Sequence, residues 1–325
     1  MRARTGPGVL LACLLLAACG QEPSGPGRAA VQAPAPPEPA PPASTGPAPA
    51  EPAPSPHLVP DGYDGPLGAV GLVLEDSSHD PQLCTGAVAA SDPPQCRGLE
   101  LAGWDWSALE PGSYESKAGS RYGDYFVVGT VEGDTLTLTQ PPRPPAAAGG
   151  VLASEEPREH DFGSPCPTPP GGWKPVDPAR ATDEAFSAGA ARAEAVEGYA
   201  GSWMDQNLPA GAPGTDIPEE LANDPQRVVL NVRTVGDREA MKAAVREVWG
   251  GALCISPAQR TEAEVQRIAD EVFARYEGSW GSVDVLTGTV EVGVPVARVS
   301  EQRELDERYG PGVVRLRGAL QPVPR

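Results

Sequence analysis

Two proline-rich stretches limit what this chain can fold into. The first, "APAPPEPAPPASTGPAPAEPAPSP" at residues 33–56, is almost entirely Pro, Ala, Glu, Ser and Gly, and the second, "PPRPPAAAGG", occupies residues 141–150. Such segments cannot bury apolar surface, and a proline-rich chain favours solvated polyproline II. The sequence therefore predicts a disordered tether over residues 20–57, which at ~3.1 Å per residue could extend on the order of 100 Å.

The N-terminal end is built like an export signal. Arg2 and Arg4 precede the apolar run "VLLACLLLAA", which suits a signal-peptide core but falls short of the ~20 residues that span a bilayer. Small residues then lead into Cys19 and Gly20. This arrangement resembles the lipobox of bacterial lipoproteins, which implies a signal peptide over residues 1–19 and acylation of Cys19. A plain secretory signal with an incidental cysteine is the alternative, and both interpretations export the protein.

The charge of the chain bears on its partners. The formal net charge is −19, and loss of Arg2 and Arg4 with the leader takes it to −21. Anionic lipid surfaces and nucleic acids repel such a body. We therefore expect no nucleic-acid partner, and a membrane contact through the lipid anchor, on the extracytoplasmic side of the cell membrane.

Four cysteines remain after processing and lipidation, and in an oxidising compartment an even set predicts disulfides. Four cysteines allow three connectivities. The turn-forming residues Ser91 to Pro94 favour a local bond, because they can fold the chain back on itself. No Cys-x-x-Cys or zinc-finger spacing occurs, so structural bonds are favoured over redox or zinc chemistry. The expected pairs are Cys84 with Cys96 and Cys166 with Cys254.

Residues 58–141 have the pattern of a small β domain. "AVGLVL" at 69–74, "YFVVGTV" at 125–131 and "TLTLTQ" at 135–140 read as strands, and the turn "EGD" joins the last two as a hairpin. The sequence predicts a small antiparallel barrel or sandwich, OB-like in type. Trp104 and Trp106 would share one face of a strand, where they either form a ligand platform or cover the edge of the core.

Residues 142–178 show no clear periodicity and are predicted to be an irregular linker. From residue 179 to 325 helices and strands alternate. A helical stripe runs from Phe186 to Trp203, "RVVLNVRTV" and "GALCIS" read as strands around a helix capped by Asp237, and Thr261 with Glu264 forms a capping box. Two β runs, a helix ending at Tyr309 and a last strand follow. The sequence predicts an α/β sandwich of one mixed sheet, ferredoxin-like with additions.

Several quoted stretches carry a resemblance to a known group. "PPQCRGLELAGWDW", "SPCPTPPGGWKPVDPARATDEA", "VWGGALCIS" and "YGPGVVRL" with "GALQPV" together resemble uncharacterised lipoproteins of high-GC Gram-positive bacteria. The resemblance covers most of the chain after residue 58. It implies architecture and anchoring, and it implies no activity, cofactor or catalytic residue.

Motifs for chemistry are scarce. The nucleophile elbow, the zinc-protease motif, the phosphate-binding loop and the dinucleotide fingerprint do not occur in the sequence. The strongest polar cluster could bind a divalent ion through hard oxygens and one imidazole, although an acidic serine-rich loop after a strand is also an ordinary solvated turn. Its members are Glu75, Asp76, His79 and Asp80. No cofactor is expected.

Two functions remain open from the sequence. The first is a non-enzymatic surface lipoprotein that binds an extracytoplasmic protein or another component of the cell envelope. The second is a secreted hydrolase whose acid-base work falls to paired carboxylates, such as Asp76 with Asp80 or Asp105 with Glu110. A deep carboxylate-lined cleft would favour the hydrolase, and a flat apolar patch would favour the binding protein.

Overall fold

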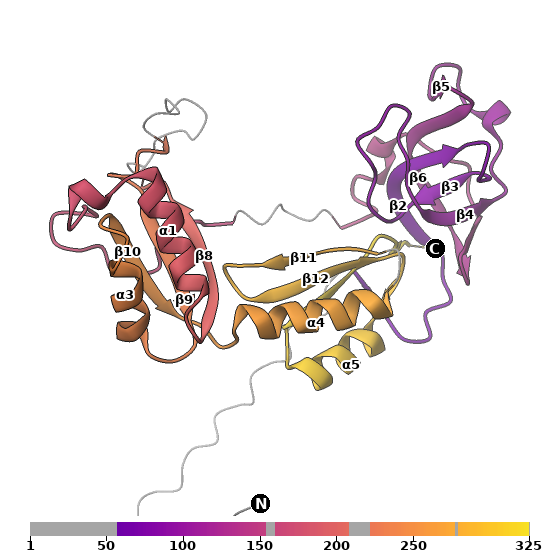
Figure 1. The fold of residues 1–325 in the computed structure, drawn as a ribbon. Helices are drawn as coiled ribbons and strands as arrows, with labels where there is room; N and C mark the ends of the chain where they lie inside the picture. Colours follow the sequence, from indigo (N-terminus) through magenta and orange to yellow (C-terminus); the bar gives the residue numbers. More distant parts are fainter. Residues whose placement is uncertain (1–56, 154–159, 208–221, 277–278, 325) are drawn as a thin grey trace, which may run out of the picture. The chain divides into compact units, whose positions relative to one another are not determined.

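A computed structural model of the protein describes residues 57–153, 160–207, 222–276 and 279–324. The predicted signal peptide, Cys19 and the tether up to residue 56 lie outside the described residues. The described part is a mixed α+β structure, mostly strands, with four α-helices and a closed five-stranded barrel (Figure 1). None of these helices has the length and apolar character needed to cross a membrane.

The barrel, drawn from indigo to magenta in Figure 1, closes because its first and fourth strands pair with each other. Hydrogen bonds connect the strands in the order β2-β3-β4-β7-β6, and β6 returns to β2. The strands are β2 (Leu67–Glu75), β3 (Gln82–Cys84), β4 (Gly98–Ala102), β6 (Ser120–Glu132) and β7 (Thr135–Leu138). Two short strands extend the sheet, β5 (Glu115–Lys117) on β6 and β15 (Gln321–Pro322) on β2.

One pairing corrects the expectation of a wholly antiparallel barrel. β4 and β7 are parallel neighbours, with Leu101 opposite Leu136, whereas the other barrel pairs are antiparallel. The reason lies in the connection that follows β4. It contains the 3-10 helix η1 (Trp106–Ala108) and β5, and the chain then runs down β6 and back up β7. β4 and β7 therefore point the same way where they meet.

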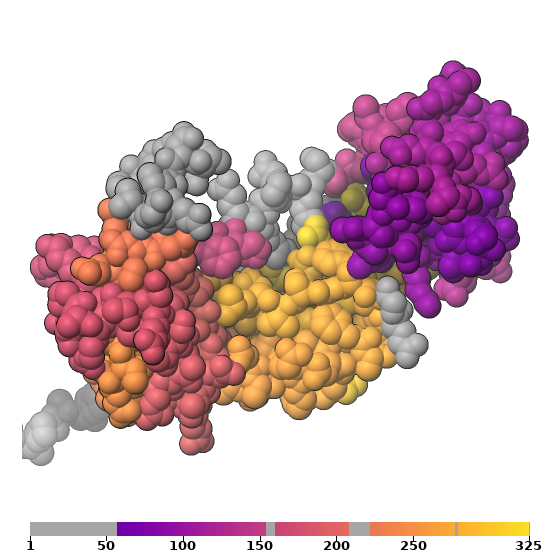
Figure 2. All heavy atoms as spheres, turned by 45° about the horizontal axis from the view of Figure 1, so that its top comes forward, coloured from indigo at the N-terminus to yellow at the C-terminus, as the bar shows by residue number. Residues whose placement is uncertain are grey.

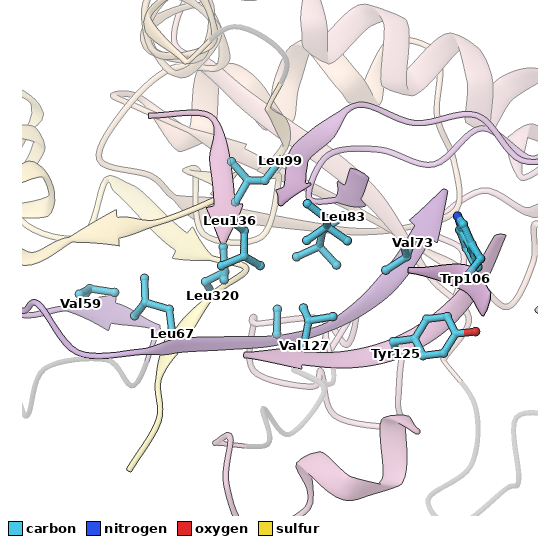
Figure 3. Close-up of a cluster of buried hydrophobic side chains, with 12 residues drawn as sticks. Val59, Leu67, Val73, Leu83, Leu99, Trp106, Tyr125, Val127, Leu136 and Leu320 are labelled. Atoms are coloured by element: carbon cyan, nitrogen blue, oxygen red, sulfur yellow. The ribbon is translucent and has the colours of Figure 1, made fainter. Parts of the chain in front are cut away.

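Alternation along the strands fills the barrel with apolar side chains (Figure 3). On β6 Tyr125 and Val127 point inward, and on β2 Leu67, Ala69 and Val73 do the same, since residues two apart share a face of a strand. In Figure 2 the residues of the barrel are the indigo-to-magenta body of spheres. The predicted hairpin is confirmed, because Glu132 pairs with Thr135 across the turn.

Short elements lie outside the barrel strands and the αββαβ units. β1 (Leu58–Val59) pairs in parallel with β13 (Ala297–Arg298). The 3-10 helix η2 (Pro145–Ala148) lies in the stretch expected to be irregular, and η3 (Pro178–Arg180) begins at the last residue of that stretch. Ala148 and Leu152 pack on the outer face of β6 against Phe126 and Val128. Part of the stretch after residue 141 is therefore packed on the barrel.

The first αββαβ unit spans residues 182–257. Its sheet has the order β10-β9-β8, in which β8 is antiparallel to β9 and β10 is parallel to β9 through a crossover helix. Apolar side chains of the sheet, such as Leu230 and Val232, pack against Met241 and Val245 of that helix. The elements are α1 (Asp183–Glu194), β8 (Tyr199–Asp205), β9 (Val229–Thr234), α3 (Arg238–Arg246) and β10 (Ala252–Pro257).

The second αββαβ unit spans residues 261–318 and has the same order and directions. β11 is antiparallel to β12, and β14 is parallel to β12 through a crossover helix. Val290 and Val292 face the helices and pack with Val265 and Leu305. The elements are α4 (Glu262–Arg275), β11 (Trp280–Asp284), β12 (Thr289–Val294), α5 (Val299–Tyr309) and β14 (Val314–Gly318).

The two units agree in detail as well as in element order. Thr182 caps α1 and Thr261 caps α4, each accepting from the amide three residues on. Asp205 and Asp284 end the first strands, and each accepts from the amide two residues on. The threonine and the aspartate are equally far apart along the chain in both units. The chain therefore carries a tandem structural repeat.

This repeat replaces the single ferredoxin-like sheet that the sequence favours, because hydrogen bonds divide the strands into two three-stranded sheets. The predicted stripe from Phe186 to Trp203 is also too long. Helix α1 ends at Glu194, and Trp203 lies on β8. Gly198 makes the turn between them with φ of +87°, a conformation that glycine tolerates and that ends the helix.

Candidate functional site

The two tryptophans named as a candidate platform lie in a packed aromatic cluster. Trp106 is 5% exposed and belongs to η1, past the end of β4. Its ring centroid is 5.1 Å from that of Trp104 with the planes at 73°, and Tyr125 lies 5.0 Å from Trp104 in a similar edge-to-face contact. Edge-to-face packing directs the rings toward one another instead of presenting two parallel faces to solvent. The pair extends the barrel core.

The candidate metal ligands Glu75 and Asp76 make hydrogen bonds in two different places. Glu75 accepts a hydrogen bond from the Trp106 indole and another, 2.6 Å long, from Arg121. Arg121 also lies 5.7 Å from the centre of the Trp106 ring. Both oxygens of the Glu75 carboxylate are thus occupied at the end of the barrel.

The Asp76 carboxylate, by contrast, accepts hydrogen bonds from residues of its own loop. It accepts from the amides of Ser78 and His79 at 2.7 and 3.0 Å, and from the His79 ring at 3.1 Å. The Ser78 hydrogen bond is the main reason that the pKa of Asp76 lies below its ordinary value. Within the part of the chain that the structure describes, no three His, Cys, Asp or Glu side chains form a group that could hold a metal, and Asp80 joins no such group.

The first member of the second carboxylate pair caps a short helix. Asp105 caps η1, accepting from the Ser107 amide at 2.8 Å and the Ser107 hydroxyl at 2.7 Å. The Ser107 hydrogen bonds lower the pKa of Asp105, which favours its ionised form. Glu110 is exposed after η1.

Both expected cysteine pairs are present. Cys84 bonds to Cys96 and Cys166 bonds to Cys254, each with Cα atoms 5.7 Å apart. The second bond joins the irregular segment before α1 to β10, an edge strand of the first sheet. There Cys254 lies opposite Asn231 on the sheet face that the helices leave uncovered.

A segment of residues 160–176, here called the cover segment, lies over that face. Cys166 and Trp173 pack against Val229, Ala252 and Cys254. The amide and hydroxyl of Ser164 donate to Asp205 at 2.8 and 2.7 Å, and Trp203 donates to the Phe162 carbonyl at 2.9 Å. The cover segment is therefore held by a disulfide, by apolar contacts and by hydrogen bonds to β8.

A groove of about 480 Å³ remains beside the cover segment. Its walls come from the cover segment, from the three strands of the first sheet and from the β11–β12 turn. The main lining residues are Ser164, Pro165, Trp203, Arg233, Ser256 and Leu286. Its lining combines apolar and polar side chains, and pockets of this volume are typical of small-ligand sites.

Arg233 and Ser256 supply the polar groups on the floor of the groove, and they are register partners on β9 and β10. One guanidinium nitrogen of Arg233 donates to the Val285 carbonyl at 3.0 Å. Burial lowers the pKa of Arg233, and Asp284 opposes this from longer range without forming an ion pair. Among the described residues, none forms a salt bridge with Arg233 or a hydrogen bond with the Ser256 hydroxyl, which is in a residue only 8% exposed.

Neither residue stands out in the sequence, because they are separated along the chain and each falls within a strand. One signal was available. "RVVLNVRTV" alternates, so Leu230 and Val232 face the helices while Asn231 and Arg233 face the other way. Polar residues on the second face of a buried strand indicate a polar site on that face of the sheet.

Comparison with protein-family models, with curated proteins and with solved structures finds no match to this chain.

Proposed function

We propose that the protein is a membrane-anchored lipoprotein of the extracytoplasmic side, and that it works as a binding protein for a component of the cell envelope. The lipobox at Cys19 supports the anchor, and the proline-rich residues 20–57 support a tether that holds the folded part away from the lipid. The proposal treats residues 58–141 as a barrel domain and residues 179–325 as the domain that carries the αββαβ units.

The observation that carries this proposal is the Cys166–Cys254 bond. It fastens the cover segment to the first sheet, and the cover segment forms one wall of the groove. A binding site whose wall depends on an oxidised bond fits a protein that works outside the reducing cytoplasm.

The barrel supports a finer assignment within the same proposal, which is an OB-like fold. Its five strands follow the order 1-2-3-5-4 and close back on strand 1, and strands 3 and 5 are parallel. Barrels of that type bind oligosaccharides or oligonucleotides. The net charge of −19 disfavours the oligonucleotides, so an envelope component is the better fit.

Crosslinking in intact cells tests the function. A photo-reactive residue is placed at Asp161, which is exposed and lines the groove, and for comparison at Glu307, which is exposed on α5. We expect an envelope component to be captured from position 161 and not from position 307. Equal capture from both positions, or none from either, would contradict the proposal.

A further inference from the structure

We infer that the groove beside the cover segment binds a monocarboxylate, with its carboxylate held by Arg233 and Ser256 and its apolar part against Trp203 and Pro165. This inference rests on the proposed binding function and names the ligand class.

The donors are the first observation. A guanidinium has five N–H donors in a planar fork that matches a carboxylate. Arg233 uses one nitrogen on the Val285 carbonyl and has no salt bridge within the described ranges. A half-buried cation with unused donors is stabilised by an anion, because burial penalises the unpaired charge.

Ser256 adds a second donor on the same floor. It lies directly opposite Arg233 across β9 and β10, so both side chains emerge on the face under the groove. Its residue is nearly buried, yet its hydroxyl meets no partner in the part of the chain that the structure describes. The hydroxyl is not among the buried unpartnered atoms of the described residues, so it is open to the groove and can donate to a bound carboxylate oxygen.

The walls of the groove determine the size and polarity of the rest of the ligand. Trp203, Pro165, Pro257 and Leu286 provide apolar surface around the two donors. The Trp203 indole is fixed in place, since its nitrogen donates to the Phe162 carbonyl. The space of about 480 Å³ admits a small acid or the last residues of a peptide.

The surrounding charge favours a monoanion over a phosphate. Asp161 also lines the groove, and Asp284 acts on Arg233 from longer range. The whole chain carries a net charge of −19. A dianion in this setting meets repulsion that one guanidinium does not offset, whereas a carboxylate neutralises Arg233 one to one.

Titration of the mature full-length chain followed by NMR tests the inference. The probes are N-acetyl-L-phenylalanine and the peptide acetyl-Ala-Ala-Ala, each as the free acid and as the C-terminal amide. We expect both acids to shift the Trp203 indole and Ser256 amide resonances and the amides to leave them unchanged. Tighter binding of the peptide acid identifies a peptide terminus as the source, and tighter binding of the amino acid identifies a small free acid.

Variants locate the carboxylate. Arg233→Gln should weaken binding of the acids by about tenfold or more, and Ser256→Ala by a smaller factor. Arg315→Gln removes the same charge from a strand outside the groove and should leave binding unchanged. If Arg233→Gln unfolds, as circular dichroism would show, Arg233→Lys and Ser256→Ala keep the test open, and each should weaken binding.

Three results would overturn the inference: equal binding of acid and amide, no binding of either acid at millimolar concentration, or wild-type binding by the folded Arg233 variants. Its failure is separable from failure of the proposed function. If Arg233→Gln still captures the envelope component through position 161, the protein is a binding protein and the carboxylate assignment alone is wrong.

Discussion

Cys254 and Arg315 occupy the same position in the two αββαβ units. Cys254 pairs with Asn231, and Arg315 pairs with Glu291. On each middle strand the residue before this position, Leu230 or Val290, faces the helices, so the pair itself lies on the opposite face of the sheet. In the first unit this position is bonded to Cys166 and lies under the cover segment. In the second unit it carries a partly exposed arginine. Equivalent positions of the repeat therefore differ in their surroundings. The disulfide is in the first unit, whose sheet face is covered by the cover segment.

Anchoring is tested at the lipobox. Cys19→Ala removes the sulfur that would be acylated, so we expect the protein to move from the membrane fraction to the soluble or secreted fraction. Cell fractionation and immunoblotting measure this, with Cys13→Ala in the leader as the matched control. A Cys19→Ala protein that stays with membranes through detergent-free washing would disprove lipid anchoring.

The tether is tested by deletion. Removing half of residues 20–57 takes away a segment that is predicted to bury nothing, so the melting temperature of the folded part should stay within about one degree. Calorimetry of the soluble forms gives the comparison. A fall of several degrees would show that the segment packs on a folded domain.

The two disulfides should differ in their effect on stability. Their cysteines are 12 and 88 residues apart. On the chain-entropy relation the shorter loop is worth roughly 3 kcal/mol and the longer roughly 4 to 5 kcal/mol. The double variant of Cys166 and Cys254 to Ala should therefore lower the free energy of unfolding more than the double variant of Cys84 and Cys96 to Ala, measured in urea. The reverse order would contradict the loop-closure argument, and peptide mapping of the unreduced protein verifies the pairs.

The capping box of α4 should be worth a measurable amount. Thr261 accepts from the Glu264 amide at 3.2 Å, and the Glu264 carboxylate accepts from the Thr261 amide at 2.8 Å. Thr261→Ala should reduce the free energy of unfolding by about 1 kcal/mol, whereas Thr261→Ser, which keeps the hydroxyl, should cost less. Equal losses in both variants would assign the effect to the methyl group and not to the cap.

Glu271 should contribute to the acid sensitivity of the second unit. The Tyr309 hydroxyl and then the Arg267 guanidinium donate to this carboxylate, and they lower its pKa below the ordinary value of 4.5. A lowered folded-state pKa means that the ionised form stabilises the fold above pH 4.5 and that this stabilisation is lost as the pH falls through the folded pKa.

Glu271→Gln removes that titration. Between pH 6 and pH 3 the wild type should lose more of its free energy of unfolding than the variant does, as followed in urea at each pH. Other carboxylates titrate equally in both proteins, so the difference isolates Glu271. Parallel pH profiles for the two proteins would refute this contribution.

Local patterns in the sequence predicted the local structure well. The hairpin after Val131, the Asp237 cap and the Thr261–Glu264 box depend on neighbouring residues, and the structure confirms each of them. Both predicted cysteine pairs are confirmed. The turn between Cys84 and Cys96 indicated the first pair, and the two remaining cysteines then form the second. The closed barrel was one of two predicted forms, because closure depends on pairing β2 with β6 across a long loop.

The repeat was missed because of one segment. Ala200 and Trp203 continue the helical spacing of Phe186 and Ala190, so periodicity alone extends the helix through them. Gly198 breaks that run, and the following residues form β8. Without β8 the first unit loses its antiparallel strand pair and no longer matches the second. The groove was missed for a related reason, since Arg233 and Ser256 meet only when β9 and β10 pair.

The barrel also depends on the far end of the chain. Leu320 is fully buried in the barrel core, and Gln321 pairs with Gly68 on β2. The residue that completes this core therefore follows both αββαβ units along the chain, although the barrel strands precede them. During synthesis the barrel strands are made before Leu320, so the barrel reaches its final packing only after both units have been made.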